Sequence, residues 1–140
     1  MNELKSRERS NAAINHPTRV LVVDDGITMR LFYRTVLEAA GFEVEEATNG
    51  VEGYEKVLTQ TFDLMIVDIN MPKMDGYSMM KAVRAEPSVR MIPTIMVSTQ
   101  SHPGDVTKAF EAGANYYLVK PVPPEELAEA ARLISGRAEQ

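Results

Sequence analysis

Short apolar runs alternate with amphipathic stretches between residues 18 and 136, and this alternation occurs five times. Four of the runs are continuous and one alternates apolar with polar residues; they lie at 20–23, 42–47, 64–67, 94–97 and 116–119. Continuous runs rich in β-branched residues predict strands that are buried on both faces of a parallel sheet. The alternating run at 42–47 predicts an edge strand.

The stretches between these runs have the apolar spacing of helices. We expect helices near 29–40, 50–60, 75–86 and 103–112, and a fifth helix from Pro124 onward. Gly41, Pro87 and Gly113 would end the first, third and fourth of these helices. The side chains expected to face the core are Met29, Phe32, Val36 and Ala40, then Val51, Tyr54 and Leu58, then Val106, Ala109 and Phe110, and finally Leu127, Ala130, Ala131 and Ile134.

Strict alternation of strands with helices predicts a parallel sheet joined by right-handed crossovers. Short connections and an edge-like second strand indicate a flavodoxin-like (βα)5 doubly wound α/β fold with strand order 2-1-3-4-5. We expect a single domain at 18–136, preceded by a flexible arm or frayed helix at 1–17 and followed by a short end at 137–140.

Composition removes several classes of function. The chain has 140 residues, no cysteine and two histidines, His16 and His102. The absence of cysteine excludes thiol chemistry, and two histidines so far apart in the sequence argue against a histidine-rich metal site. A net charge of −5 argues against a nucleic-acid partner. No apolar run approaches the ~20 residues of a membrane span, and the N-terminal residues have no apolar signal-peptide core. We therefore expect a cytoplasmic protein with no membrane partner.

Polar residues stand where the predicted strands end. Asp24 and Asp25 follow the first strand, Asp68 the third, Ser98 the fourth and Lys120 the fifth. Ligands in sheets of this type bind at the carboxyl ends of the strands, so the topology brings these side chains together. Three neighbouring carboxylates repel one another unless a cation lies among them. Oxygen ligands without histidine or cysteine favour a hard divalent ion, and Mg²⁺ is the first candidate.

Each of these residues also has an ordinary structural interpretation. An acidic pair after a strand can cap the following helix, a single strand-end aspartate can belong to a turn, and a lysine before a proline can be a solvated surface charge. The convergence of all five residues on one edge of the sheet favours a site.

The chain resembles the receiver domains of response regulators from two-component signalling. The resemblance covers residues 18–135 and rests on four motifs in order, VLVVDD, MIVDINMPKMDG, IMVS and YYLVKP. The stretch from Asp24 to Arg30 looks most like the single-domain, chemotaxis-type receivers.

The resemblance implies a role for each matching residue. Asp68 matches the phosphoacceptor, and Lys120 and Ser98 match the groups that bind the phosphoryl oxygens. Mg²⁺ would be bound by Asp25 directly, by Asp24 through water, by Asp68 and by the backbone carbonyl of Asn70. Ser98 and Tyr117 match the switch pair, and Asn70 and Gln100 match the positions that tune hydrolysis. Two departures are visible, Ser98 where threonine is commoner and Val122 where an aromatic residue is common; neither disables the site.

The expected function is that of a phosphoacceptor switch and not of an enzyme, with weak Mg²⁺-dependent autophosphorylation and autodephosphorylation. Asp68 would take its phosphoryl group from a phosphohistidine on a sensor histidine kinase or histidine phosphotransfer protein. The output would be contact with a downstream protein through the fourth helix, fifth strand and fifth helix, residues 102–133. We further expect Ser98 to move toward the phosphoryl group and Tyr117 to rotate from exposed to buried. The Lys120–Pro121 bond is expected to be cis.

Other functions remain open at this point. A flavodoxin-type FMN carrier would share the sheet, but the acidic pair at Asp24 and Asp25 would repel the cofactor's phosphate. A phosphorelay intermediate is possible, as is the receiver part of a longer DNA-binding or enzymatic regulator. Only four residues follow Gly136, which leaves no room for an output domain within this sequence.

Overall fold

The structure, a computed structural model, describes residues 18–136 of the chain. The expected arm at 1–17 and end at 137–140 lie outside the described residues. Strands and helices alternate in the order β1 (Arg19–Val23), α2 (Ile27–Ala39), β2 (Glu43–Ala47), α3 (Gly50–Thr59), β3 (Leu64–Asp68), α4 (Gly76–Ala85), β4 (Thr94–Ser98), α5 (Pro103–Ala112), β5 (Tyr116–Val119) and α6 (Pro124–Ile134).

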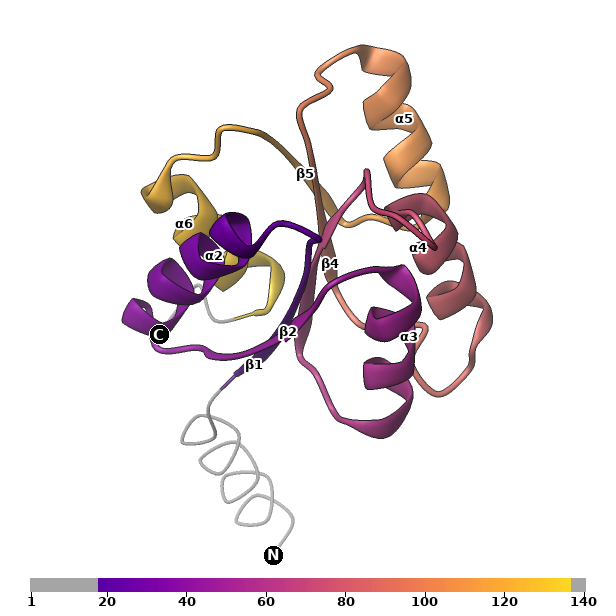
Figure 1. Cartoon of the computed structure of the whole chain (residues 1–140), viewed down its shortest axis with the longest axis horizontal. Helices are drawn as coiled ribbons and strands as arrows, with labels where there is room; N and C mark the ends of the chain where they lie inside the picture. Colours follow the sequence, from indigo (N-terminus) through magenta and orange to yellow (C-terminus); the bar gives the residue numbers. More distant parts are fainter. Residues whose placement is uncertain (1–17, 137–140) are drawn as a thin grey trace, which may run out of the picture.

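The five strands form one parallel sheet in the order β2-β1-β3-β4-β5, which confirms the flavodoxin-like prediction. Helices α2 and α6 cover one face of the sheet, and α3, α4 and α5 cover the other (Figure 1). Each face therefore has its own apolar core. All side chains of β3 and β4 are buried because helices cover both faces of these central strands.

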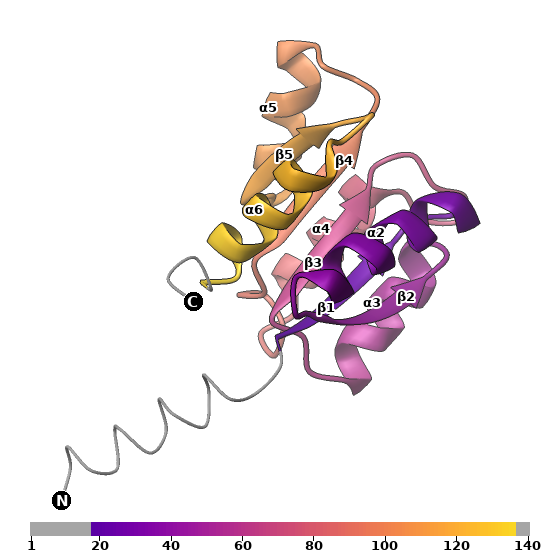
Figure 2. The same cartoon turned by 90° about the vertical axis from the view of Figure 1, so that its left-hand side faces the viewer.

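The four methionines of the central sheet and α4 are fully buried, namely Met65, Met79, Met80 and Met96. In the edge strand β5, by contrast, only Leu118 is buried, and Tyr116 and Val119 are exposed. The continuous apolar run at 116–119 therefore does not mark a strand buried on both faces. Its position at the end of the sheet leaves one side without a neighbouring strand (Figure 2).

Helix α3 buries a different face from the one expected, and the predictions for α2 and α5 are confirmed only in part. In α3, Val51 and Leu58 are exposed, whereas Gly50, Gly53 and Val57 are buried. The reason is close packing against α4, since a side chain at Gly53 would lie 2.8 Å from the Met79 methyl carbon.

In α2 the fully buried residues are Tyr33 and Leu37, and the expected stripe from Met29 to Ala40 is only half-buried beside them. In α5, Ala109 is buried as expected, whereas Phe110 is exposed and Ala112 faces the core. The prediction for α6 is confirmed, with Leu127, Ala130 and Ala131 buried and Ile134 packed beside them. Within residues 18–136, no helix has the length and apolar character needed to cross a bilayer.

Candidate functional site

The carboxyl ends of the strands bring the predicted acidic residues together. Asp24 follows β1 directly, and Asp68 is the last residue of β3. One carboxylate oxygen from each of Asp24, Asp25 and Asp68 lies within 4.8 Å of the other two. Asp24 and Asp68 are buried, whereas Asp25 is exposed. The cluster therefore has two carboxylates in the protein interior and one at the surface.

Lys120 joins this cluster from the end of β5. Its Nζ atom lies 2.9 Å from Asp68 Oδ1 and 3.3 Å from Asp24 Oδ2. Its backbone N–H donates to the Ser98 carbonyl at 2.8 Å, which ties the residue to the end of β4. The Lys120–Pro121 bond is cis, as predicted. The alternative interpretation of Lys120 as a solvated surface charge is therefore wrong.

The turn after β1 is held by two groups. Asp24 Oδ1 accepts a hydrogen bond from the Gly26 N–H at 2.8 Å, and Gly26 is the N-cap of α2. Arg30 donates to the Asp24 carbonyl at 2.9 Å and pairs with Glu46 of β2 at 2.9 Å. Sequence reasoning missed Arg30, and its position one helical turn after Gly26 was the only available signal. Asp24 thus stabilises the turn and also belongs to the acidic cluster.

The loop after β3 approaches Asp68 closely at Gly76. The Gly76 N–H donates to the Ile69 carbonyl at 2.8 Å. A Cβ atom at this position would lie 2.5 Å from the Asp68 carbonyl oxygen. Only glycine fits without displacing the backbone that holds Asp68, which explains why the loop ends in Asp75-Gly76.

Opposing influences act on the charges of Asp68 and Lys120. Burial raises the pKa of Asp68, Lys120 lowers it, and the charges of Asp24 and Asp25 raise it, with a raised pKa as the net result. For Lys120, burial lowers the pKa, but the hydrogen bond to Asp68 and the charge of Asp24 outweigh it, so the pKa is raised. Without a metal ion, the ionised Asp68 carboxylate therefore costs the folded state free energy at neutral pH.

Replacing Asp68 with asparagine is expected to stabilise the metal-free fold at neutral pH, because it removes a carboxylate whose pKa is raised, chiefly by burial. An acid with a raised pKa is destabilising above that pKa, whereas below its ordinary value the acid is protonated in both states. The gain should thus disappear in acid, below about pH 3.9. Urea unfolding in EDTA measures it, with exposed Glu111→Gln as the control. A variant less stable than the wild type at neutral pH would contradict this expectation.

Ser98, Gln100 and Tyr117 form a chain of hydrogen bonds beside the cluster. Ser98 is buried at the end of β4, and its Oγ accepts from the Gln100 N–H at 3.1 Å. The Tyr117 hydroxyl donates to the Gln100 carbonyl at 2.6 Å. The Tyr117 ring is half-buried and packs against the apolar core on the face of the sheet that α3, α4 and α5 cover. In this structure Tyr117 is therefore neither fully exposed nor fully buried.

The remaining predicted residues lie at the edges of this region. Asn70 and Gln100 are exposed, each two positions after a buried site residue. His102 is the N-cap of α5, where its Nδ1 accepts from the Gly104 N–H at 3.0 Å. Tyr33, which sequence reasoning missed, is fully buried, and its hydroxyl has no hydrogen-bond partner among the described residues. Burial and the charges of Asp24 and Asp68 raise the pKa of Tyr33.

The donor set fits a magnesium ion. The three clustered groups are all carboxylates, they repel one another, and hard divalent cations prefer oxygen ligands. Both oxygens of Asp24 already contact protein donors, one from Gly26 and one from Lys120. The exposed Asp25 is therefore the carboxylate with most freedom to contact an ion directly.

Comparisons with known proteins agree with this geometry. The response regulator receiver domain family matches residues 20–132. A gliding motility regulatory protein from Myxococcus xanthus is 42% identical over 102 residues, which are 73% of this chain but only 13% of that protein. Chemotaxis protein CheY1 from Helicobacter pylori strain J99 is 40% identical over 120 residues, which are 84% of this chain and 97% of that protein.

Two solved structures show the same fold. Chemotaxis protein CheY4 of Vibrio cholerae superposes with a TM-score of 0.81 at 36% identity, covering 85% of this chain and 99% of that one. The receiver domain of sensor histidine kinase PA1611 from Pseudomonas aeruginosa superposes with a TM-score of 0.80 at 26% identity, covering 86% and 99%. That structure has a magnesium ion coordinated in its active-site cleft.

Receiver domains are switch proteins that bind Mg²⁺ and work with histidine kinases or downstream partners, rather than classical enzymes. The clustered carboxylates, the lysine that contacts them, and the family match over residues 20–132 lead to one conclusion. The chain belongs to the response regulator receiver domain family of two-component signalling, and among its relatives are chemotaxis proteins of the CheY type.

Proposed function

We propose that Asp68 accepts a phosphoryl group from a phosphohistidine and that the phosphorylated chain binds a protein partner. The observation that carries this proposal is the placement of Lys120 Nζ 2.9 Å from a buried aspartate at the end of a central strand. A structural ion pair would not require two further carboxylates within 4.8 Å. A site that must collect positive charge around an incoming anion does require them.

In the proposed reaction, a carboxylate oxygen of Asp68 attacks phosphorus while the bond from phosphorus to the histidine nitrogen breaks. The imidazole leaves with the bonding electron pair and takes up a proton, and an acyl phosphate remains on Asp68. Lys120 and the Ser98 hydroxyl contact the phosphoryl oxygens, whose negative charge they stabilise. Asp25, Asp68, the Asn70 carbonyl and, through water, Asp24 would hold Mg²⁺, which would supply additional charge neutralisation.

The phosphate donor is a sensor histidine kinase or a histidine phosphotransfer protein. The same site also supports weak autophosphorylation from small donors and slow hydrolysis of its acyl phosphate. Asn70 and Gln100 lie two positions after Asp68 and Ser98, where exposed side chains can tune that hydrolysis. The chemotaxis relatives support a single-domain output by protein contact, with a phosphorelay intermediate as the alternative role.

Borohydride trapping tests the assignment of Asp68. The full chain is incubated with Mg²⁺ and a phosphorylated histidine-kinase domain, and borohydride then reduces the acyl phosphate to a homoserine residue that mass spectrometry locates. We expect homoserine at position 68 and none in the Asp68→Asn variant. Trapping at Asp24 or Asp25, or no trapping at any aspartate, would show that the proposed function is wrong.

The switch is proposed to run through Gln100, because this residue bonds to Ser98 by its N–H and to Tyr117 by its carbonyl. When Ser98 turns its hydroxyl to the phosphoryl group, its bond to Gln100 is lost and Tyr117 moves with the loop. The surface of α5, β5 and α6 then changes, and partner affinity changes with it. Coupling of linked sites is typically ~1–3 kcal/mol, or about 5- to 150-fold in affinity.

Beryllofluoride with Mg²⁺, a mimic of the phosphoryl group, tests this switch by NMR. We expect resonances of Ser98, Gln100 and Tyr117 to shift together, and a Tyr117→Phe variant to retain the Ser98 shift but lose the response in α5. Leu58, which is exposed near the end of α3, serves as an internal reference. If Gln100 and Tyr117 are unmoved while Asp68 is occupied, the output takes another route.

A further inference from the structure

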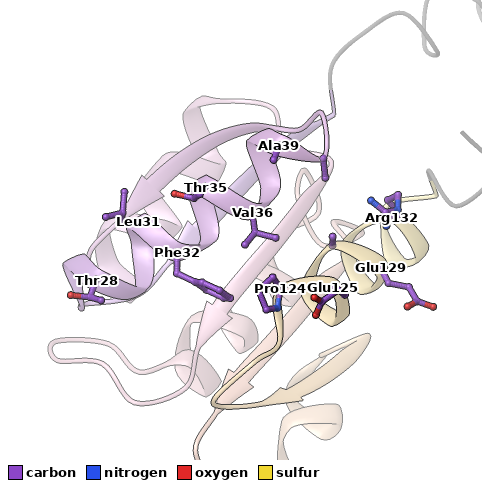
Figure 3. Close-up of a pocket in the computed structure, with 12 residues that line it drawn as sticks. Thr28, Leu31, Phe32, Thr35, Val36, Ala39, Pro124, Glu125, Glu129 and Arg132 are labelled. Atoms are coloured by element: carbon purple, nitrogen blue, oxygen red, sulfur yellow. The ribbon is translucent and has the colours of Figure 1, made fainter.

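An apolar groove runs between α2 and α6, on the face of the sheet away from α3, α4 and α5 (Figure 3). It has a volume of about 960 Å³ and is lined on the α2 side by Leu31, Phe32 and Val36. Leu31 is 64% exposed, which is unusual for a leucine that faces other apolar groups. An open apolar groove of this size favours occupation by another segment of protein.

The α6 side of the groove has two acidic residues at a defined spacing. Glu125 and Glu129 both line the groove and both are exposed. They lie four residues apart on one helix, so they stand one above the other along its axis. Their charges are not neutralised by any ion pair within the described residues. An occupant that carries two positive charges at the same spacing would match this wall.

The start of β1 lies close to the end of the groove formed by the last turn of α6. The Arg19 N–H donates to Asp63 at 2.8 Å, and Asp63 lines the same small hollow as Ser135, the residue after α6. Arg132 of α6 lines the groove one turn earlier. The chain that precedes β1 therefore joins the domain beside the end of α6, and residues 1–17 are tethered within reach of the groove.

We propose that residues 1–17 bind in the groove between α2 and α6 of the same molecule. Even in the compact form of a helix, 17 residues would span about 26 Å at 1.5 Å per residue, whereas α6 spans 11 residues or about 17 Å. The segment is therefore long enough to follow α6 along its whole length. Because it enters at the end of α6, it would run parallel to α6, with residue numbers increasing in the same direction.

The sequence of this segment agrees with such a register. If residue 15 lies level with Ser135, Lys5 and Arg9 lie level with Glu125 and Glu129, and all four side chains share the i, i+4 spacing. The same register places Ala12, a small uncharged residue, opposite the one cation of the groove, Arg132. Leu4 then reaches the apolar part of the groove.

This docking is independent of the phosphoryl chemistry. The family match begins at residue 20, so the segment lies outside the part shared with receiver domains in general. A covalent tether supplies a high effective concentration, on the order of mM for a short linker, so even weak contacts can be populated. Since α2 begins two residues after Asp25, a protein that approaches the site over α2 would have to displace the segment.

Paramagnetic relaxation tests the proposal, because a chain without cysteine accepts a single nitroxide label at an introduced Ser6→Cys. We expect the amides of Thr35 and Ala128, which line the groove, to lose most of their intensity. The amide of Thr59 on the opposite helix layer should keep its intensity. High salt should weaken the effect, because the contacts include exposed charges.

Charge variants separate the proposed contact from random proximity. Lys5→Glu with Arg9→Glu should restore the groove intensities, and adding Glu125→Lys with Glu129→Lys should recover the broadening. Arg7→Glu and Glu126→Lys are the matched controls. In the proposed register Arg7 would face away from Glu125 and Glu129, and Glu126 does not line the groove, so neither change should have an effect. Circular dichroism of each variant excludes loss of folding as the cause of the result.

Three outcomes would overturn the proposal. The groove amides could keep their full intensity, or the broadening could persist unchanged in the charge-reversed variants. The third outcome comes from a mixture of two samples, one spin-labelled without ¹⁵N and one ¹⁵N-enriched without a spin label. Groove amides broadened as much in this mixture as in the singly labelled chain would show that the segment occupies the groove of a second copy.

Discussion

A Lys120→Met variant is expected to accept a phosphoryl group about 10²- to 10³-fold more slowly than the wild type, the effect of removing one preorganised charged donor. Lys120 contacts both Asp68 and Asp24, so it is already in place before any phosphoryl group arrives. Its fixed position means that no reorganisation is needed when negative charge develops on the phosphoryl oxygens. The rate is measured with a small acyl-phosphate donor and saturating Mg²⁺, by mass spectrometry over time.

The matched control for this measurement is Lys81→Met, which removes an exposed lysine of α4 with no contact to the cluster. Circular dichroism establishes that both variants are folded. A Lys120→Met rate equal to that of the Lys81→Met variant would contradict the role proposed for Lys120. It would mean that the 2.9 Å ion pair with Asp68 is purely structural.

The second large effect concerns metal affinity, which Asp25→Ala is expected to weaken by at least about tenfold, equivalent to ~1.4 kcal/mol. Asp25 is exposed and its carboxylate has no hydrogen-bond or ion-pair partner among the interactions described for residues 18–136. Its free oxygens can therefore contact Mg²⁺ directly. Asp24→Ala is a weaker test, since loss of its bond to Gly26 also disturbs the turn before α2.

Calorimetric titration of Mg²⁺ into the wild type and the Asp25→Ala variant measures this difference. Glu55→Ala, which removes an exposed carboxylate of α3, controls for the change in net charge. Equal Mg²⁺ affinities for the wild type and Asp25→Ala would remove Asp25 from the proposed ligand set. An equal loss in Glu55→Ala would show that the effect is general electrostatics.

Much of the site could be predicted from the sequence for one physical reason. A parallel sheet places the carboxyl ends of its strands at one edge, so a residue immediately after a strand is located in space as soon as the strand is recognised. Asp24, Asp68, Ser98 and Lys120 were located in this way. The distances from Lys120 to Asp68 and Asp24 confirm that these three meet, and the Lys120 N–H bonds to the Ser98 carbonyl. The strand order followed from the short connections and the edge-like second strand.

The inward faces of the helices could not be predicted as well. The apolar period of α3 placed Val51 and Leu58 inside, but Gly50 and Gly53 take that position. Glycine contributes nothing to a hydrophobic pattern, yet its lack of a side chain allows α3 to approach α4 closely. The buried face of a helix therefore depends on how closely its neighbours can approach, and this distance is a property of the packed fold.

The sequence by itself determined the order of the strands and the set of charged groups at their ends, since both depend on periodicity and chain topology. Only the tertiary structure decided how those groups are held: the bond from Arg30 to the Asp24 carbonyl, the position of Gly76 against Asp68, and the link from Ser98 through Gln100 to Tyr117. Only the folded chain shows the groove between α2 and α6. These features join residues from different elements. Their contacts form or fail with differences of a few tenths of an ångström in position, which periodicity does not encode.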